Sequence, residues 1–275
     1  MDVNTLEKYF RDETAAFPGK TAYLLKDLSE GKAASGSADG LYIAANAADR
    51  VVSASTIKVP VMMALLHRFR TEGRSLAEMI RVEEAEILPD SKVFQYGPRE
   101  ASFYELLVWM IVNSDNTASN VLMDYIGFEE LNRFFKAIGL RNTSAGRKML
   151  DFNAIEQGRN NYISLEDFYA CISHLYIHEK AGDDMAVMAM SILRRNRDFD
   201  ILLRYIYEDV RCAHKSGGLD DIVHEGAVFE TEYGKWFLGV FISGFEAGEE
   251  GVKAAERLAG RLSRKVMDFY EEKEA

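Results

Sequence analysis

The sequence predicts an α+β fold, because strand-like segments near both ends of the chain enclose a long helical stretch. Two strand patterns occur first, a mostly helical stretch runs from about 68 to 205, and three more strand patterns follow. An amphipathic segment stands at each end of the chain. This order allows the two ends to share one antiparallel sheet while the middle forms a separate helical layer.

The N-terminal region predicts a helix followed by two strands. Apolar residues at helical spacing indicate a short amphipathic helix: Leu6, Tyr9, Phe10 and Phe17. Residues 21–28 are typical of a strand, and a Gly/Ser-rich turn over 29–40 leads to a second strand that begins at Leu41.

The middle of the chain predicts apolar helices. Residues 56–70 form a strongly apolar one, with Pro60 near its beginning, where a missing N–H is tolerated. Residues 104–113 predict a buried helix, 117–126 a helix that continues directly from it, and 165–178 a further helix.

The C-terminal region returns to strands and ends in a helix. We expect a short strand at 213–217 and two more at 222–229 and 236–243, the last two joined by a turn at 232–234. Residues 252–269 repeat apolar side chains at helical spacing, which predicts one buried face.

Composition excludes several classes of partner. The net charge is −11, which argues against a nucleic-acid-binding surface and against docking to anionic lipid. No apolar run approaches the length of a transmembrane helix, so we expect no membrane span. The expected partner is a small-molecule substrate, and the oligomeric state stays open.

The N-terminus and the cysteines bear on the compartment. The first residues lack the basic n-region and the apolar stretch of a signal peptide. We therefore expect a cytoplasmic protein as written, or an extracytoplasmic one if a signal peptide has been removed. Cys171 and Cys212 can pair, but two cysteines form no disulfide framework, and free thiols are the simpler expectation.

Three short motifs indicate the chemistry. They are Ser55-Thr56-Ile57-Lys58, Ser114-Asp115-Asn116 and Lys215-Ser216-Gly217, in that order along the chain. They match Ser-x-x-Lys, Ser-Asp-Asn and Lys-(Thr/Ser)-Gly, the three motifs of the penicillin-recognising serine hydrolases. The chain therefore resembles a class A β-lactamase or a small penicillin-binding protein over nearly its whole length.

This resemblance implies a fold and a domain division. The fold is the three-layer β-lactamase/DD-peptidase-like one, with an antiparallel sheet flanked by the terminal helices and an all-helical subdomain. We expect a single domain over 1–275, in which 1–67 and 206–275 form an α/β subdomain and 68–205 the helical subdomain.

The first motif supplies a nucleophile and its base. A serine hydroxyl is a weak nucleophile until a neighbouring group takes its proton. Residues three apart on a helix share a face, so Ser55 and Lys58 can meet. Lys58 precedes the apolar run 59–63, and burial among cations would lower its pKa enough for it to act as a base.

The other motifs complete the site by resemblance. Ser114 would relay a proton to the leaving nitrogen, and Asn116 would orient Lys58 and the substrate amide. In the third motif, Lys215 would hold a substrate carboxylate, and Ser216 replaces the commoner threonine but keeps the hydroxyl. Gly217 completes this motif, and the N–H of Gly218 would form an oxyanion hole with that of Ser55.

The base for deacylation does not match the family pattern. Class A β-lactamases carry a glutamate after the Ser-Asp-Asn helix, in a Glu-Pro dipeptide followed by Leu-Asn, and it activates the water that removes the acyl group. The corresponding stretch, 147–158, has no proline and no Glu-x-x-x-Asn. Asp151 and Glu156 are its only acids, so they are the candidates for this role.

These motifs predict a class A β-lactamase-like serine hydrolase that is acylated at Ser55 and hydrolyses the β-lactam amide bond, as in β-lactam catabolism or antibiotic resistance. A D-Ala-D-Ala carboxypeptidase or esterase with slow β-lactam deacylation is the alternative. A non-catalytic receptor and a glutaminase are weaker ones. No motif requires a cofactor or a metal, although His174 and His178 stand four apart on a predicted helix.

Overall fold

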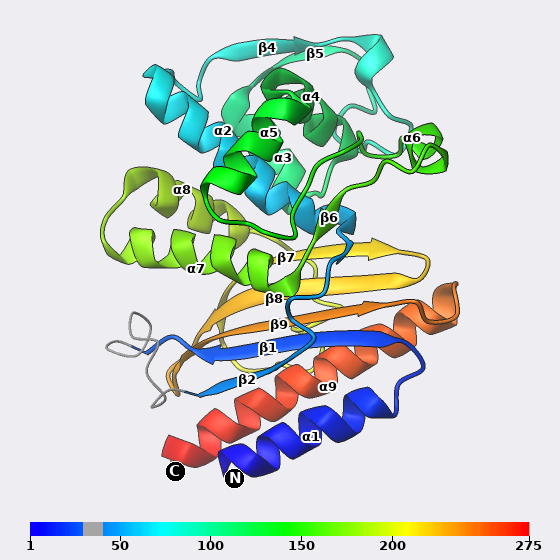
Figure 1. Ribbon diagram of the computed structural model, residues 1–275. Helices are drawn as coiled ribbons and strands as arrows, with labels where there is room; N and C mark the ends of the chain where they lie inside the picture. Colours follow the sequence, from blue (N-terminus) through cyan, green and yellow to red (C-terminus); the bar gives the residue numbers. More distant parts are fainter. Residues whose placement is uncertain (30–40, 275) are drawn as a thin grey trace.

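The structure confirms the α+β fold, whose centre is an antiparallel sheet built from both ends of the chain (Figure 1). The computed structural model describes residues 1–29 and 41–274, so the predicted turn at 29–40 lies, beyond Ser29, outside the described residues. All neighbouring strands are antiparallel. In spatial order the strands are β2 (Tyr42–Ala45), β1 (Lys20–Asp27), β9 (Lys235–Ser243), β8 (Ile222–Glu230) and β7 (Arg211–Leu219).

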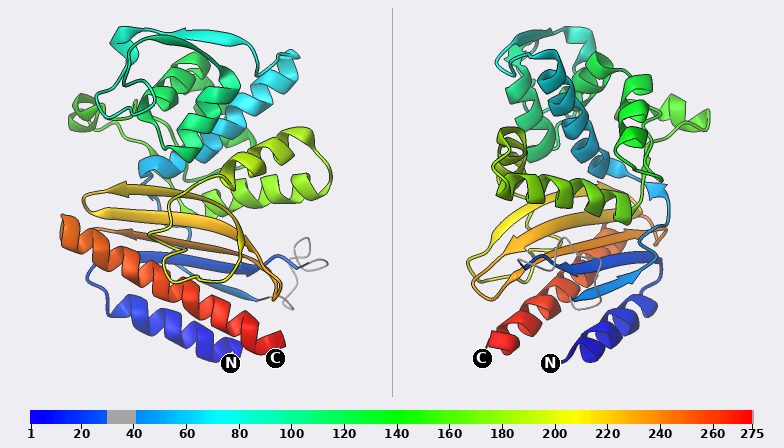
Figure 2. Two further views of the ribbon diagram at one scale, coloured as in Figure 1. Left: turned by 180° about the vertical axis from the view of Figure 1, so that it is seen from behind. Right: turned by 60° about the vertical axis from the view of Figure 1, so that its left-hand side comes forward.

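The two terminal helices cover one face of this sheet. Helices α1 (Val3–Ala15) and α9 (Glu249–Glu274) lie side by side there, and both chain ends meet at the same side of the molecule (Figures 1 and 2). Alternate strand residues such as Leu238 and Val240 are fully buried against these helices, as the two-residue period of a strand requires.

The helical layer covers the other face. Helix α7 packs against β1, β8 and β9, and α8 against β7. The helices of this layer are α2 (Lys58–Glu72), α3 (Phe103–Val112), α4 (Asn116–Ile126), α5 (Phe128–Ala137), α6 (Phe152–Glu156), α7 (Leu165–Lys180) and α8 (Asp184–Leu193).

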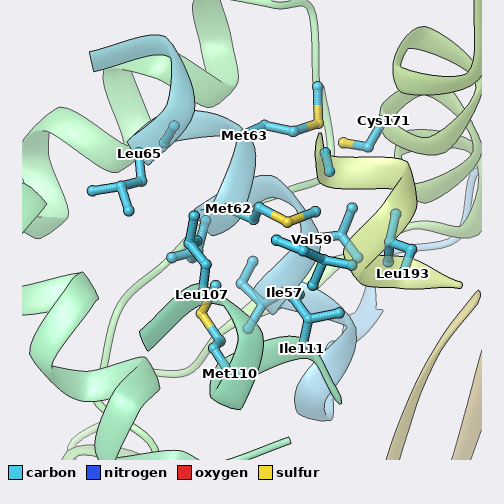
Figure 3. Close-up of a cluster of buried hydrophobic side chains, with 14 of the residues drawn as sticks. Ile57, Val59, Met62, Met63, Leu65, Leu107, Met110, Ile111, Cys171 and Leu193 are labelled. Atoms are coloured by element: carbon cyan, nitrogen blue, oxygen red, sulfur yellow. The ribbon is translucent and has the colours of Figure 1, made fainter. Parts of the chain in front are cut away.

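Helix α2 runs through the middle of this layer, which explains why its sequence is apolar on nearly all sides. Figure 3 shows Met62 and Met63 of α2 packed among Leu107 and Ile111 of α3 and Cys171 of α7, and all five are buried. The nucleophile motif at the start of α2 is therefore anchored by a helix that lies within the helical core.

Short strands interrupt the middle region, which was predicted to be mostly helical. Within 68–205, β4 (Met79–Val82) and β5 (Arg99–Ser102) form a hairpin, and β6 (Tyr162–Ile163) pairs with β3 (Val51–Val52). These strands are two to four residues long, so they are too short to show a clear apolar alternation. The division at 67/68 and 205/206 stays a prediction.

The boundaries around the motifs also differ from the prediction. Instead of one helix over 56–70, a 3₁₀ turn (Ala54–Ile57) precedes α2. Helix α4 does not continue directly from α3, since the chain turns sharply at Ser114, whose φ is 52°. Strand β7 is nine residues long rather than short.

The remaining features of the sequence have plain structural roles. Cys171 and Cys212 are free thiols buried in the cores on opposite faces of the sheet. The rings of His174 and His178 lie 4.1 Å apart, but no group of three potential metal ligands occurs within 1–29 and 41–274. None of the helices in those ranges has the length and apolar character needed to span a bilayer.

Candidate active site

The nucleophile motif lies at the junction of the 3₁₀ turn and α2. Ala54, directly before Ser55, has a φ of 45°, in the left-handed region that non-glycine residues rarely adopt. Such strain persists only where the surrounding structure imposes it, and it is concentrated at functional sites. Ser55 is half-buried, whereas Lys58, the first residue of α2, is fully buried.

The Lys58 amine binds the second motif. Its Nζ donates to the backbone oxygen of Ser114 (2.6 Å), the Ser114 Oγ (3.1 Å) and the Asn116 Oδ1 (2.9 Å). Burial lowers the pKa of Lys58 well below its usual range, and the positive charge of Lys215 lowers it further. Asp115 and Asp90 oppose this shift.

The second motif is held in place by a neighbouring loop. Asp115 accepts a hydrogen bond from the Ala118 N–H at the start of α4 (2.8 Å) and another from the Ser91 hydroxyl (2.6 Å), so its carboxylate holds the motif in place. Asn116 donates its amide to Asp90 (2.7 Å), so its carbonyl oxygen faces Lys58. Asp90 and Ser91 belong to no motif, and sequence reasoning missed them.

The third motif approaches from the edge of the sheet. The Nζ of Lys215 donates to the Ser114 Oγ (3.2 Å) and to the Ser216 backbone oxygen (2.7 Å). Burial lowers the pKa of Lys215 to about 8, while Asp198 and Glu225 act in the opposite direction. The hydroxyl of Ser114 therefore lies between two buried amines, one from α2 and one from β7. His214 points to the other face of β7, where its Nδ1 lies 2.6 Å from Glu225.

Gly217 brings β7 directly against the nucleophile. A Cβ at this position would lie 2.8 Å from the backbone nitrogen of Ser55 and 2.9 Å from that of Thr56. A Cβ on Gly218 would meet nothing closer than 3.7 Å. Only the missing side chain of Gly217 leaves room beside the Ser55 N–H.

The hydroxyl of Ser216 is already engaged. Its Oγ donates to the carboxylate of Asp198 at 2.5 Å. Asp198 lies on the segment between α8 and β7, which no motif marks, so this neighbour was also missed from the sequence.

The two candidate deacylation bases do not join this group. The carboxylate of Asp151 accepts from the Ala154 N–H (3.0 Å) and thereby caps α6, and Glu156 is exposed at the other end of that helix. Among the described residues, neither makes a hydrogen bond or ion pair with Ser55, Lys58 or Ser114. The structure thus brings the three motifs together and leaves both acids apart from them.

Comparison with known proteins gives consistent results. A family model described as the beta-lactamase enzyme family matches residues 5–270. A beta-lactamase of Rhodobacter capsulatus is 33% identical over 214 residues, covering 75% of this chain and 72% of the relative.

Solved structures share the fold at low identity. The beta-lactamase of Sphaerobacter thermophilus aligns over 98% of both chains with a TM-score of 0.83 and 21% identity. A mutant of PBP-A, solved as an acyl-enzyme complex with penicillin-G, aligns over 98% of this chain and 97% of its own with a TM-score of 0.83 and 21% identity.

Proposed function

The chain belongs to the beta-lactamase enzyme family. We propose that it is a class A-type serine hydrolase that opens the β-lactam amide bond by acylation of Ser55. One observation carries the proposal. Lys58 is fully buried, has a depressed pKa, and is hydrogen-bonded to Ser114 and Asn116 one helical turn from Ser55.

The acylation step uses each motif once. The Oγ of Ser55 attacks the amide carbon while the neutral amine of Lys58 takes the hydroxyl proton. The Ser55 and Gly218 N–H groups stabilise the oxyanion. The carbon–nitrogen bond then breaks, and Ser114 passes a proton to the leaving nitrogen and recovers one from Lys58. The product is an ester on Ser55.

Hydrolysis of that ester has less support. A water molecule must lose a proton as it attacks, and among the described residues Asp151 and Glu156 make no hydrogen bond or ion pair with the motif residues. This observation favours the alternative function, a D-Ala-D-Ala carboxypeptidase or esterase in which β-lactams leave a slowly hydrolysed acyl group. A part in β-lactam catabolism or antibiotic resistance requires fast hydrolysis.

A chromogenic cephalosporin tests both functions. We would follow colour and intact mass together, with Ser55→Ala as the control. Many turnovers that depend on Ser55 would support a β-lactamase, and one stoichiometric burst with a lasting adduct would support the peptidase or esterase. An absence of both colour and adduct would contradict β-lactam chemistry. Ligand binding that survives in Ser55→Ala, without any catalysis by the wild-type protein, would indicate a receptor.

The rate of acylation should depend on pH through both lysines. Above its depressed pKa Lys58 is neutral and can accept a proton, so the second-order rate constant should rise with pH through that value. With an anionic β-lactam it should fall again near pH 8, where Lys215 loses its charge. In Lys215→Met the rising limb should move to higher pH, because a positive neighbour that lowers the pKa of Lys58 is gone. A rising limb that stays in place would contradict this coupling.

Gly217→Ala should slow acylation at least about 100-fold, the cost of a lost oxyanion-hole donor. Its methyl group would lie 2.8 Å from the Ser55 nitrogen and obstruct the oxyanion position. The rate of adduct formation, measured by mass spectrometry, checks this. Gly218→Ala is the matched comparison, because its nearest atom lies at 3.7 Å and its own N–H stays in place, so it should lose less activity than Gly217→Ala. Equal losses in the two variants would count against a role specific to Gly217.

A further inference from the structure

The carboxylate of Asp198 is fixed against the motif strand. One oxygen accepts the hydrogen bond from the Ser216 hydroxyl, and the other accepts from the Asp200 N–H at 3.4 Å. The Asp198 N–H donates to the side chain of Asn196 (3.1 Å), and the buried amide of Asn196 donates to the backbone oxygen of His214 (3.3 Å). Two side chains thus fasten this segment to β7, so the position of Asp198 belongs to the architecture of the site.

This arrangement puts the negative charge of Asp198 beside the strand residue that follows the positively charged Lys215. Lys215 is the buried cation beside Ser216, and Asp198 is the acid that most strongly favours its charged form. Over residues 1–29 and 41–274, neither Asp198 nor Lys215 has an oppositely charged group within 4 Å. The Lys215 amine donates to Ser114 and Ser216 instead.

We propose that Asp198 is a specificity-determining residue that disfavours acyl donors with a carboxylate opposite Lys215 and Ser216, and thereby selects uncharged esters or amides. The Ser216 hydroxyl has one hydrogen, and Asp198 already receives it. A substrate carboxylate has to compete for that hydrogen and to place a second negative charge beside the first, which is unfavourable in a poorly solvated site. This inference rests on the proposed acylation of Ser55 and specifies its substrate class.

Benzylpenicillin and its methyl ester form a matched pair of probes, since they differ by one methyl group and by the charge of the group that would face Ser216. We expect the ester to acylate wild-type Ser55 at least tenfold faster than the acid. In Asp198→Asn, which keeps an oxygen acceptor for Ser216, the rate for the acid should rise at least tenfold, while the rate for the ester stays within threefold. Asp200→Asn, an exposed neighbour that makes no contact with Ser216, should leave both rates unchanged.

Two results would overturn the inference. One is a wild-type protein that prefers the acid, and the other is a ratio of the two rates that is the same in wild type and in Asp198→Asn. Rates that fall together would assign Asp198 a purely structural part.

A binding measurement separates this inference from the acylation proposal. If neither probe forms an adduct on Ser55, the proposed function fails. Calorimetry of N-acetyl-D-alanine binding then tests whether Asp198 disfavours a carboxylate, with Ser55→Ala compared with the double variant Ser55→Ala/Asp198→Asn. The double variant should have a Kd at least tenfold lower, and no gain in affinity would overturn the inference.

Discussion

Replacing Lys58 by methionine is expected to slow acylation of Ser55 about a thousandfold, within the range for loss of a general base. The side-chain partners of Lys58 among the described residues are Ser114 and Asn116, and neither accepts a proton readily at neutral pH. Asp151 and Glu156 are separate from the motifs. Among the described residues, the remaining amine of the site, Lys215, is hydrogen-bonded to Ser114 and Ser216 rather than to Ser55, so the variant should have little residual activity.

Lys58→Arg distinguishes a base from a mere positive charge. A guanidinium stays protonated at any working pH, so it keeps the charge but cannot accept the serine proton. We expect Lys58→Arg to lose acylation as Lys58→Met does. The exposed Lys92 provides a control, and Lys92→Met should acylate like wild type. Adduct formation by mass spectrometry gives the rates, and thermal unfolding shows that the variants are folded. A Lys58→Met protein within tenfold of wild type would contradict the assignment.

The motif geometry was predictable because each motif carries its own local constraint. Spacing on a helix brings Lys58 near Ser55, and strand alternation sends Lys215 and His214 to opposite faces of β7. The antiparallel sheet was predictable for a similar reason, since apolar strands at the two ends of the chain have no other way to bury both faces. In these cases a short segment contained the information.

The partners of the motifs were not predictable, because they act across long stretches of chain. Asp90 reaches Asn116 from 26 residues away, and Asp198 reaches Ser216 from 18. From the sequence, an aspartate in a polar loop is expected to face solvent, and the pattern is the same when it is hydrogen-bonded to an active-site residue. The left-handed φ of Ser114 is also invisible in sequence, because it is imposed by the contacts that hold the loop.

Met149 is the position at which we would introduce the missing base. Asn120 clamps its backbone, since the Met149 N–H donates to the side chain of Asn120 (2.6 Å) and its carbonyl accepts from it (3.2 Å). Asn120 lies one turn beyond Asn116 on α4, so the clamp connects this loop to the helix that binds Lys58. Met149 also precedes Asn153 by four residues, the spacing of glutamate and asparagine in the class A pattern.

Met149→Glu is therefore expected to speed hydrolysis of the acyl-enzyme about 100-fold, the lower end of the range for an added general base. Acylation should change little, because Lys58 and its partners are untouched. The nearly buried site makes the new carboxylate costly, so we expect a loss of about 1–3 kcal/mol of stability and a lower melting temperature. Single-turnover decay of the penicillin adduct measures the gain.

Met149→Gln separates the charge from the shape of the new side chain. It has the same length as the glutamate but no basic oxygen, so its adduct should decay at the wild-type rate. If Glu and Gln accelerate decay equally, the gain comes from a loosened loop rather than from proton transfer. If Asp151→Asn or Glu156→Gln abolishes turnover in the wild-type background, a base is already present and Met149 does not stand in its place. A gain confined to Met149→Glu would mean that one apolar side chain, on a loop already fixed to α4, sets the lifetime of the acyl-enzyme.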